Sequence, residues 1–319
     1  MDLKSKIILI SGPTASGKSN FAIKLANKIR GEIINADSMQ VYKELKILTA
    51  RPIKQKYQKI KHHLYGFQSV KKKFSTGKWL KLAYEKIDII KKRKNIPILV
   101  GGTGLYFKAL TDGLVKIPNI PFKFRKKIRN LQKKLDQKKF FKQLIKLDPL
   151  INEKINPTDV QRSIRAYEVK SYTKKSLVHW FKNTKAKFAE DDFIKIYIDY
   201  PRQDLLDKIS TRAEQMLKQG AIEEVKKFLK LKVGKDKTSN KVIGINEIKD
   251  FLNKKSDLSE VKEKITVKTR QYAKRQSTWA RGQMMNWQKV NPKDLKKFLK
   301  KNYLIPLKLD QWVQLQLDW

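Results

Sequence analysis

Three apolar runs in the first hundred residues have the length of short buried strands. They lie at 7–10, 33–34 and 96–100. Between the first two runs, Phe21, Leu25 and Ile29 recur every four residues, which indicates a helix with one buried face. Strands that alternate with helices are typical of a parallel sheet. The pattern therefore predicts an α/β core.

The pattern changes in the middle of the chain. Between 118 and 186, cations interleave with Leu, Ile and Phe at helical spacing, and no strand is evident. An alternating run at 193–200 then returns the chain to the sheet, and long helices follow it. We therefore predict three segments: the first part of the core at 1–117, an all-α insertion at 118–186, and completion of the core with C-terminal helices at 187–319.

The stretch GPTASGKS at 12–19 joins the first predicted strand to its helix. Gly12, four residues, and then Gly17, Lys18 and Ser19 have the spacing of a phosphate-binding P-loop. Backbone N–H groups of such a loop point at phosphate oxygens, Lys18 adds a positive charge, and the Ser19 hydroxyl is a ligand for Mg²⁺. The motif favours a nucleoside triphosphate but does not by itself name the ligand.

Composition narrows the class of protein. The 319 residues include no cysteine, which excludes disulfides and thiol nucleophiles, and 40% are hydrophobic, which favours a folded protein. No apolar stretch approaches the roughly 20 residues of a membrane span, so we expect a cytoplasmic enzyme. The net charge of +44 suits a nucleic-acid partner. Only 12 of the 74 basic residues are arginine, so a coding bias toward lysine explains the charge equally well.

Chemistry-bearing residues recur where predicted strands end. Asp37 follows the second run and Thr103 follows the third, and ligands of parallel sheets bind beyond the carboxyl ends of the strands. Asp37 could accept a proton from an amino group, such as the exocyclic amine of adenine, while Ser38 and Gln40 could read the edge of a base. A role for Asp37 beside Mg²⁺ is the alternative.

Two other classes of function fit parts of this pattern. A P-loop kinase or another NTP-dependent enzyme would suit the first hundred residues. A non-catalytic RNA-binding protein with a relict P-loop would suit the charge. The second is disfavoured because binding an RNA backbone does not require Asp37, Thr103 and a P-loop at neighbouring strand ends.

Seven stretches in order resemble the bacterial tRNA dimethylallyltransferase family across about residues 6–290. They read GPTASGKS, ADSMQVY, TARP, HHL, LVGGTGLYFKAL, QRSIRAYEV and RQYAKRQSTW. The resemblance implies a P-loop NTPase-like parallel sheet core with an all-α insertion domain. It also implies transfer of the dimethylallyl group from dimethylallyl diphosphate to N6 of the adenosine 3′-adjacent to the anticodon, with release of diphosphate.

The resemblance assigns roles residue by residue. Asp37 is implied as the general base, and Thr103 as a hydroxyl near the reacting centre. The diphosphate-binding residues are Gly12, Pro13, Thr14, Ala15, Ser16, Gly17, Lys18 and Ser19, with Ser19 as the metal ligand for Mg²⁺. The tRNA-binding residues are Asp37, Ser38, Met39, Gln40, Thr103, Arg125, Gln161, Arg162, Ser163, Ile164 and Arg165. The partners are the anticodon stem-loop of tRNA and dimethylallyl diphosphate, with no membrane, and the expected state is a monomer.

One departure from the family pattern concerns charge. Many members read VGYR where this chain has IGIN at 243–246, so Asn246 replaces an arginine. Lys241 or Arg212 could supply the missing cation. His62 and His63 are adjacent, and on an extended segment they point in opposite directions, so we interpret them as structural rather than as a shared metal site.

Overall fold

The computed structural model describes residues 5–52, 59–182, 184–294 and 297–298. Contacts divide the chain into two units, one of residues 1–108 with residues from 188 onward, and one of residues 109–187. The end of the segment predicted at 187–319 lies outside the described residues. Among the described residues, no helix is long and apolar enough to cross a membrane.

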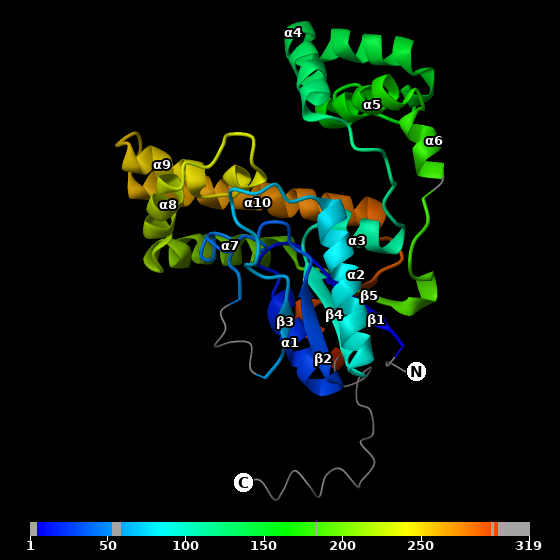
Figure 1. Cartoon of the computed structure of the whole chain (residues 1–319). Helices are drawn as coiled ribbons and strands as arrows, with labels where there is room; N and C mark the ends of the chain where they lie inside the picture. Colours follow the sequence, from blue (N-terminus) through cyan, green and yellow to red (C-terminus); the bar gives the residue numbers. More distant parts are fainter. Residues whose placement is uncertain (1–4, 53–58, 183, 295–296, 299–319) are drawn as a thin grey trace, which may run out of the picture. The chain divides into compact units, whose positions relative to one another are not determined.

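The first unit is built on a six-stranded parallel sheet (Figure 1). Its strands are β1 (Ile7–Ser11), β2 (Gly31–Asn35), β3 (His62–His63), β4 (Ile96–Gly101), β5 (Phe193–Ile198) and β6 (Gln288–Val290). Their order is β3-β2-β4-β1-β5-β6, and every pairing is parallel. The predicted α/β class and parallel sheet are confirmed. The short edge strands β3 and β6 were not predicted.

The centre of the sheet is buried on both faces. Every residue of β1 and β4 is buried, because helices cover a parallel sheet on both sides. α1 (Lys18–Ile29) packs its predicted apolar face, including Phe21 and Leu25, against Ile8 and Ile98. α2 (Thr76–Lys92) begins after Ser75, whose side chain accepts a hydrogen bond from the Lys78 amide.

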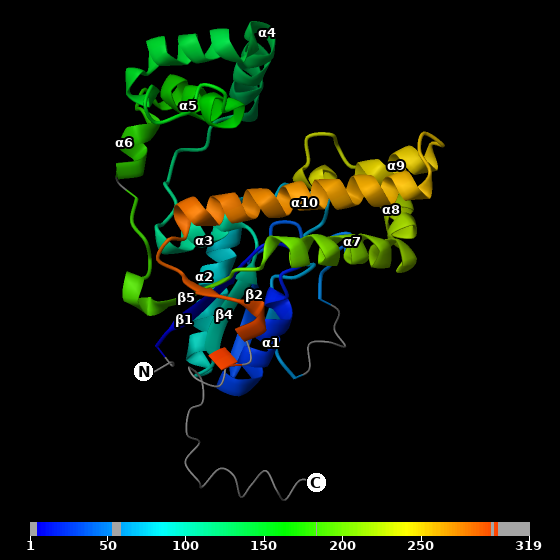
Figure 2. The same cartoon turned by 180° about the vertical axis from the view of Figure 1, so that it is seen from behind.

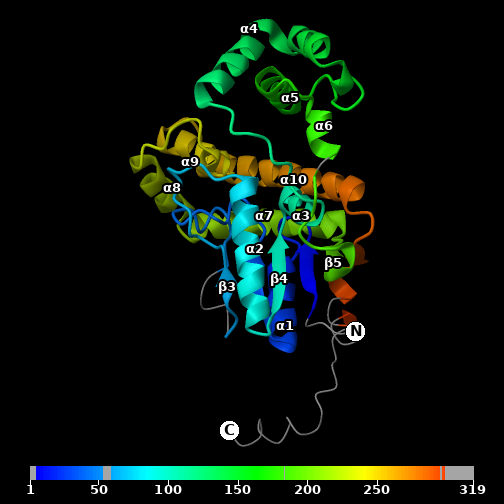
Figure 3. The same ribbon diagram turned by 45° about the vertical axis from the view of Figure 1, so that its right-hand side comes forward.

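A layer of helices lies beyond the carboxyl ends of the strands. It comprises α3 (Gly104–Thr111), α7 (Arg202–Lys218), α8 (Ala221–Lys230), α9 (Ile245–Leu252) and α10 (Leu258–Gln283). The long helix α10 runs across this end of the sheet in all three views (Figures 1, 2 and 3). The residues of α10, late in the sequence, therefore lie at the carboxyl ends of strands that come early in the sequence.

The regular secondary structure of the second unit is helical in its described residues. It contains α4 (Phe122–Leu147), α5 (Val160–Thr173) and α6 (Leu177–Lys182). α4 is kinked at Asp136, which has a left-handed φ of 58°. Leu144 of α4 and Val169 of α5 are fully buried in one cluster. By its contacts this unit spans 109–187, and the helical insertion was predicted at 118–186.

Candidate active site

The P-loop leaves β1 and enters α1 in a conformation that only some residues allow. Gly17, immediately before α1, has a φ of 80°, a left-handed value that favours glycine. The Lys18 ammonium folds back and donates to the carbonyl of Pro13 at 3.1 Å. The hydroxyl of Ser16 is buried and has no hydrogen-bond partner among the described residues. A buried hydroxyl without a protein partner, in a loop of this type, fits a site for an anionic ligand.

Charged side chains from three elements meet at the P-loop. Arg212 of α7 donates from Nη1 to the Thr14 hydroxyl at 3.1 Å. Burial lowers the pKa of Lys18 to about 8; the charge of Asp37 opposes this shift and that of Arg212 adds to it. Burial also lowers the pKa of Arg212, while Asp37 raises it. Lys18 and Arg212 carry two positive charges, and Asp37 neutralises only one of them. The remaining positive charge can attract a diphosphate.

A cavity of about 570 Å³ opens beside these charges. Its lining includes the polar side chains of Lys18, Ser19 and Asp37. It also includes the apolar side chains of Leu48, Ile209, Ala213, Met216, Val242, Ile243 and Ile265. A cavity lined by both charged and apolar side chains suits a ligand with a diphosphate and a short hydrocarbon.

Asp37 is fixed by the loop that follows β2. Asn35, at the end of β2, accepts from the Asp37 amide at 2.9 Å and donates to the carbonyls of Asp37 and Leu64, each at 3.0 Å. Oδ1 of Asp37 accepts from the amides of Met39 at 2.8 Å and Gln40 at 3.3 Å. Oδ2 makes no hydrogen bond to any described residue, and Asp37 lines the cavity. One carboxylate oxygen is therefore held in place and the other is available to a substrate.

Thr103 lines a second, smaller cavity of about 280 Å³. Its hydroxyl accepts from the Ser38 amide at 2.9 Å and donates to the Ser38 hydroxyl at 3.2 Å. Tyr272 and Arg275 line both cavities. Two adjacent cavities thus lie at the strand ends, with Asp37 in the first and Thr103 in the second.

Side chains of α10 lie against the GGTG turn that follows β4. Gln276 donates to the Gly102 carbonyl at 2.9 Å and accepts from the Thr14 amide at 2.8 Å. A Cβ on Gly104 would lie 2.2 Å from the ring of Trp279. The sequence assigns Gln276 no role, and it leaves Tyr272 and Trp279 open between packing and contact with a phosphate backbone. The spacing of 272, 276 and 279 on one helical face was the signal that could have found them.

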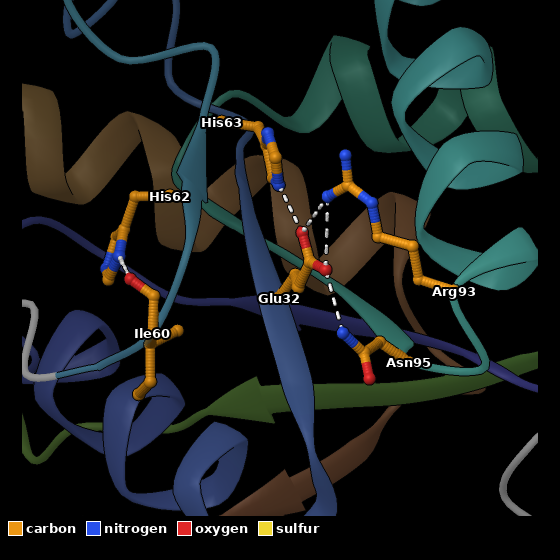
Figure 4. A network of polar contacts seen from close by, with 6 residues as sticks. All are labelled: Glu32, Ile60, His62, His63, Arg93 and Asn95. Atoms are coloured by element: carbon orange, nitrogen blue, oxygen red, sulfur yellow. Dashed lines mark hydrogen bonds and ion pairs between the residues drawn. The ribbon is translucent and has the colours of Figure 1, made fainter.

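The adjacent histidines of β3 do point in opposite directions (Figure 4). Nδ1 of His62 contacts the Ile60 carbonyl at 3.0 Å. Nε2 of His63 lies 2.6 Å from buried Glu32, which also accepts from Asn95 at 2.8 Å and from Arg93 at 3.3 Å. His63 has a structural role, because its contact with Glu32 fastens the edge strand to β2.

The remaining predicted site residues lie in the second unit. Arg125 is on α4, and 161–165 form the start of α5, where Gln161 and Arg162 are exposed. Ser163 and Ile164 are buried. Ser163 is hydrogen-bonded to Gln137 and to the Asp159 carbonyl, so the side chains of Ser163 and Ile164 do not form a surface for RNA.

The residues that could hold Mg²⁺ are few. Among the described residues, no group of three or more His, Cys, Asp or Glu side chains is placed to bind a metal. Ser19 and Asp37 both line the first cavity, and Mg²⁺ commonly binds one or two protein oxygens together with substrate phosphates and water. The residues present therefore fit a Mg²⁺ ion that arrives with a diphosphate.

The departure at Asn246 has a structural counterpart. Asn246 is exposed and lines neither described cavity, whereas Lys241 and Arg212 both line the first cavity. The two cations suggested as replacements are thus both placed at the site, and Arg212 reaches the P-loop itself.

Comparisons with known proteins find relatives that cover most of this chain. The family model described as IPP transferase matches residues 40–283. The chain is 62% identical over 311 residues to the tRNA dimethylallyltransferase of Pelagibacter ubique, covering 98% of this chain and 99% of that protein. Among solved structures, it is similar to the tRNA isopentenylpyrophosphate transferase of Bacillus halodurans, with 28% identity, a TM-score of 0.67, and coverage of 98% and 99% of the two chains. A eukaryotic dimethylallyltransferase acting on tRNA gives 29% identity and a TM-score of 0.79 over 93% of this chain and 76% of that one. This chain therefore belongs to the IPP transferase family, the family of the tRNA dimethylallyltransferases.

Proposed function

We propose that this protein transfers the dimethylallyl group of dimethylallyl diphosphate to N6 of the adenosine 3′-adjacent to the anticodon of tRNA. The observation that carries the proposal is the pair of cavities that share Tyr272 and Arg275. The first is lined by P-loop residues and by apolar side chains, and it suits the donor. The second, which contains Thr103, suits the adenine, since a loop base can leave its stack at modest cost.

The chemistry forms a C–N bond, breaks a C–O bond and transfers one proton. N6 attacks C1 of the dimethylallyl group, the C1–O bond to the diphosphate breaks, and the bonding electrons leave with the diphosphate. The N6 proton passes to the available Oδ2 of Asp37. The lone pair of N6 is delocalised into the ring, so a carboxylate that accepts the proton as attack proceeds lowers the barrier.

The leaving group gains charge as the C1–O bond breaks. Lys18, Arg212 and the amides of the P-loop would hold this charge, and these donors are fixed before the reaction begins. Ser19 would hold Mg²⁺, which supplies further neutralisation of the diphosphate when bound. Ser38 and Thr103 would contact the adenine, and Met39 and Gln40 would lie beside Asp37.

The tRNA partner is the anticodon stem-loop, and its backbone would be contacted by exposed or half-buried residues of the second unit, namely Arg125, Gln161, Arg162 and Arg165. Within this proposal the enzyme acts as a cytoplasmic monomer. ATP is not a substrate, because the P-loop serves the diphosphate of the donor.

The experiment is single-turnover prenylation with Asp37→Asn. We expect the rate to fall by about 100-fold or more, while the dissociation constants of donor and tRNA change by less than about threefold. Asp207→Asn, an exposed site on α7, is the matched control. An Asp37→Asn rate near that of wild type would remove the proton-acceptor role. Nucleotide consumption that depends on tRNA would instead assign the P-loop to ATP.

A further inference from the structure

Glu168 of α5 is a buried acid surrounded by arginines. Its side chain is only 1% exposed. Arg125 donates from Nε to Oε2 at 3.1 Å, and Arg129 donates from Nε to Oε1 at 3.4 Å. Nη1 of Arg165 lies 3.6 Å from Oε2. One carboxylate thus organises three guanidinium groups, and we call Arg125, Arg129 and Arg165 the arginine platform.

The platform is set by helical spacing. Arg125 and Arg129 are four residues apart on α4, and Arg165 and Glu168 are three apart on α5, so each pair shares one face of its helix. The faces meet because α4 and α5 pack through the buried side chains of Ile128, Phe140 and Ile164. The packing of the second unit alone therefore fixes the arrangement.

Each arginine keeps hydrogen-bond donors for another partner. Arg125 and Arg129 use Nε for Glu168, and their Nη groups donate in no hydrogen bond among the described residues. The side chains of the three arginines are 38%, 48% and 40% exposed in chain order. A guanidinium held through Nε presents its outer edge to solvent, and that edge is the part that grips a phosphate.

The charge of the cluster is unbalanced. Three cations surround one anion, and burial lowers the pKa of Arg165, with Glu168 opposing the shift and Arg125 adding to it. A buried ion pair contributes little net stability, and an apolar replacement of similar volume is often as stable. By contrast, exposed Arg162 pairs one-to-one with Asp159 at 3.4 Å. The excess of two positive charges indicates a site for an external polyanion.

We propose that Glu168 is a positioning residue that holds Arg125, Arg129 and Arg165 as one binding surface for the phosphates of tRNA. This inference rests on the proposed function and adds Arg129 to the expected contacts. Glu168 does not touch RNA. It acts by fixing the direction of three guanidinium groups, so that they need not be ordered when RNA binds.

The test separates positioning from charge by the sign of the effect. Glu168→Gln removes a negative charge beside the platform, which by simple electrostatics tightens RNA binding. Positioning predicts weaker binding, with the Kd for tRNA raised about fivefold or more near 150 mM salt. Glu153→Gln makes the same change at an exposed site in the second unit and is the matched control, for which we expect a Kd equal to that of wild type or slightly lower.

A second variant keeps the inference testable if Glu168→Gln does not fold. Arg129→Lys retains the charge at a half-exposed position but loses the Nε–H that contacts Glu168. We expect KM for tRNA to rise about fivefold rather than kcat to fall. Arg129→Ala should also reduce the slope of log Kd against log salt by about 0.7 to 0.9, the value of one phosphate contact. Circular dichroism and thermal melting establish that each variant is folded.

The outcomes are distinct from those of the proposed function. If wild-type protein prenylates tRNA but Glu168→Gln and Arg129→Lys bind tRNA as tightly as wild type, the platform is overturned and the function stands. If wild-type protein forms no prenylated tRNA yet both variants weaken tRNA binding, the platform stands as an RNA site and the proposed reaction fails.

Discussion

Because the pKa of Lys18 is lowered, we expect the affinity for the donor to change between pH 7 and pH 9. Burial lowers this pKa from 10.5 to about 8, and the protonated amine is the form that attracts a diphosphate. The protonated fraction is therefore about 90% at pH 7 and about 10% at pH 9. The apparent Kd of dimethylallyl diphosphate should rise about tenfold between these values. With an ordinary lysine pKa of 10.5, it would be almost constant.

Other titrations do not obscure this effect. The phosphates of the donor, with a last pKa near 6, are essentially ionised above pH 7. Burial raises the pKa of Tyr272 and Tyr106, so both phenols stay neutral across the range. The assay is calorimetric titration of the donor at fixed Mg²⁺ from pH 7 to 9.

Lys18→Arg serves as the control, because arginine stays charged throughout this range. Its Kd for the donor should be higher than that of wild type at pH 7, since a planar guanidinium replaces a compact ammonium group. This Kd should not change with pH. A wild-type Kd that is flat to pH 9 would refute the reasoning, since it would mean that burial and Arg212 do not depress this lysine. A dependence that persists in Lys18→Arg would assign the titration to another group.

Three further predictions concern packing and the polar network. Gly104→Ala places a Cβ 2.2 Å from the Trp279 ring and should cost about 1–3 kcal/mol, measured as a lower Tm. The control is Gly282→Ala on α10, where a Cβ meets nothing within 4 Å, and it should raise stability by about 0.5–1 kcal/mol. An equal fall in Tm in both variants would contradict the close contact between Gly104 and Trp279. Gln276→Leu leaves the Thr14 amide unpaired and should weaken donor binding about tenfold, so an unchanged calorimetric Kd would show that this bond does not shape the P-loop. The pKa of Glu32 is lowered, against the effect of its burial, by hydrogen bonds from Asn95 and His63. The stability that it contributes is therefore complete above about pH 4.5 and lost as pH falls below that value, and urea unfolding of Glu32→Gln should lack this acid-dependent loss.

Local patterns carried most of what the sequence could predict. The P-loop, the strands at 7–10 and 96–100, and the position of Asp37 depend on neighbouring residues, so spacing alone reveals them. The two-residue strand β3 has no period to detect, and it exists because Glu32 and Asn35 fasten it to β2. Short edge strands of this kind depend on tertiary contacts rather than on propensity.

Long-range partners were beyond the reach of sequence patterns. Gln276 bonds an amide 262 residues away, and nothing local distinguishes it from a solvated glutamine on α10. The orientation of α5 was similarly hidden: Ser163 and Ile164 belong to a motif that resembles a tRNA-contacting segment, yet the helix turns them inward. The same orientation of α5 buries Glu168, which contacts the three arginines of the platform.

Mass analysis of tRNA nucleosides tests the central claim most directly. Purified protein is incubated with Mg²⁺, unmodified tRNA and dimethylallyl diphosphate, and a parallel sample receives ATP in place of the isoprenoid donor. We predict N6-dimethylallyl adenosine only in the sample with the donor, in proportion to the diphosphate released. No modified nucleoside with the donor, together with consumption of ATP in the parallel sample, would contradict the account.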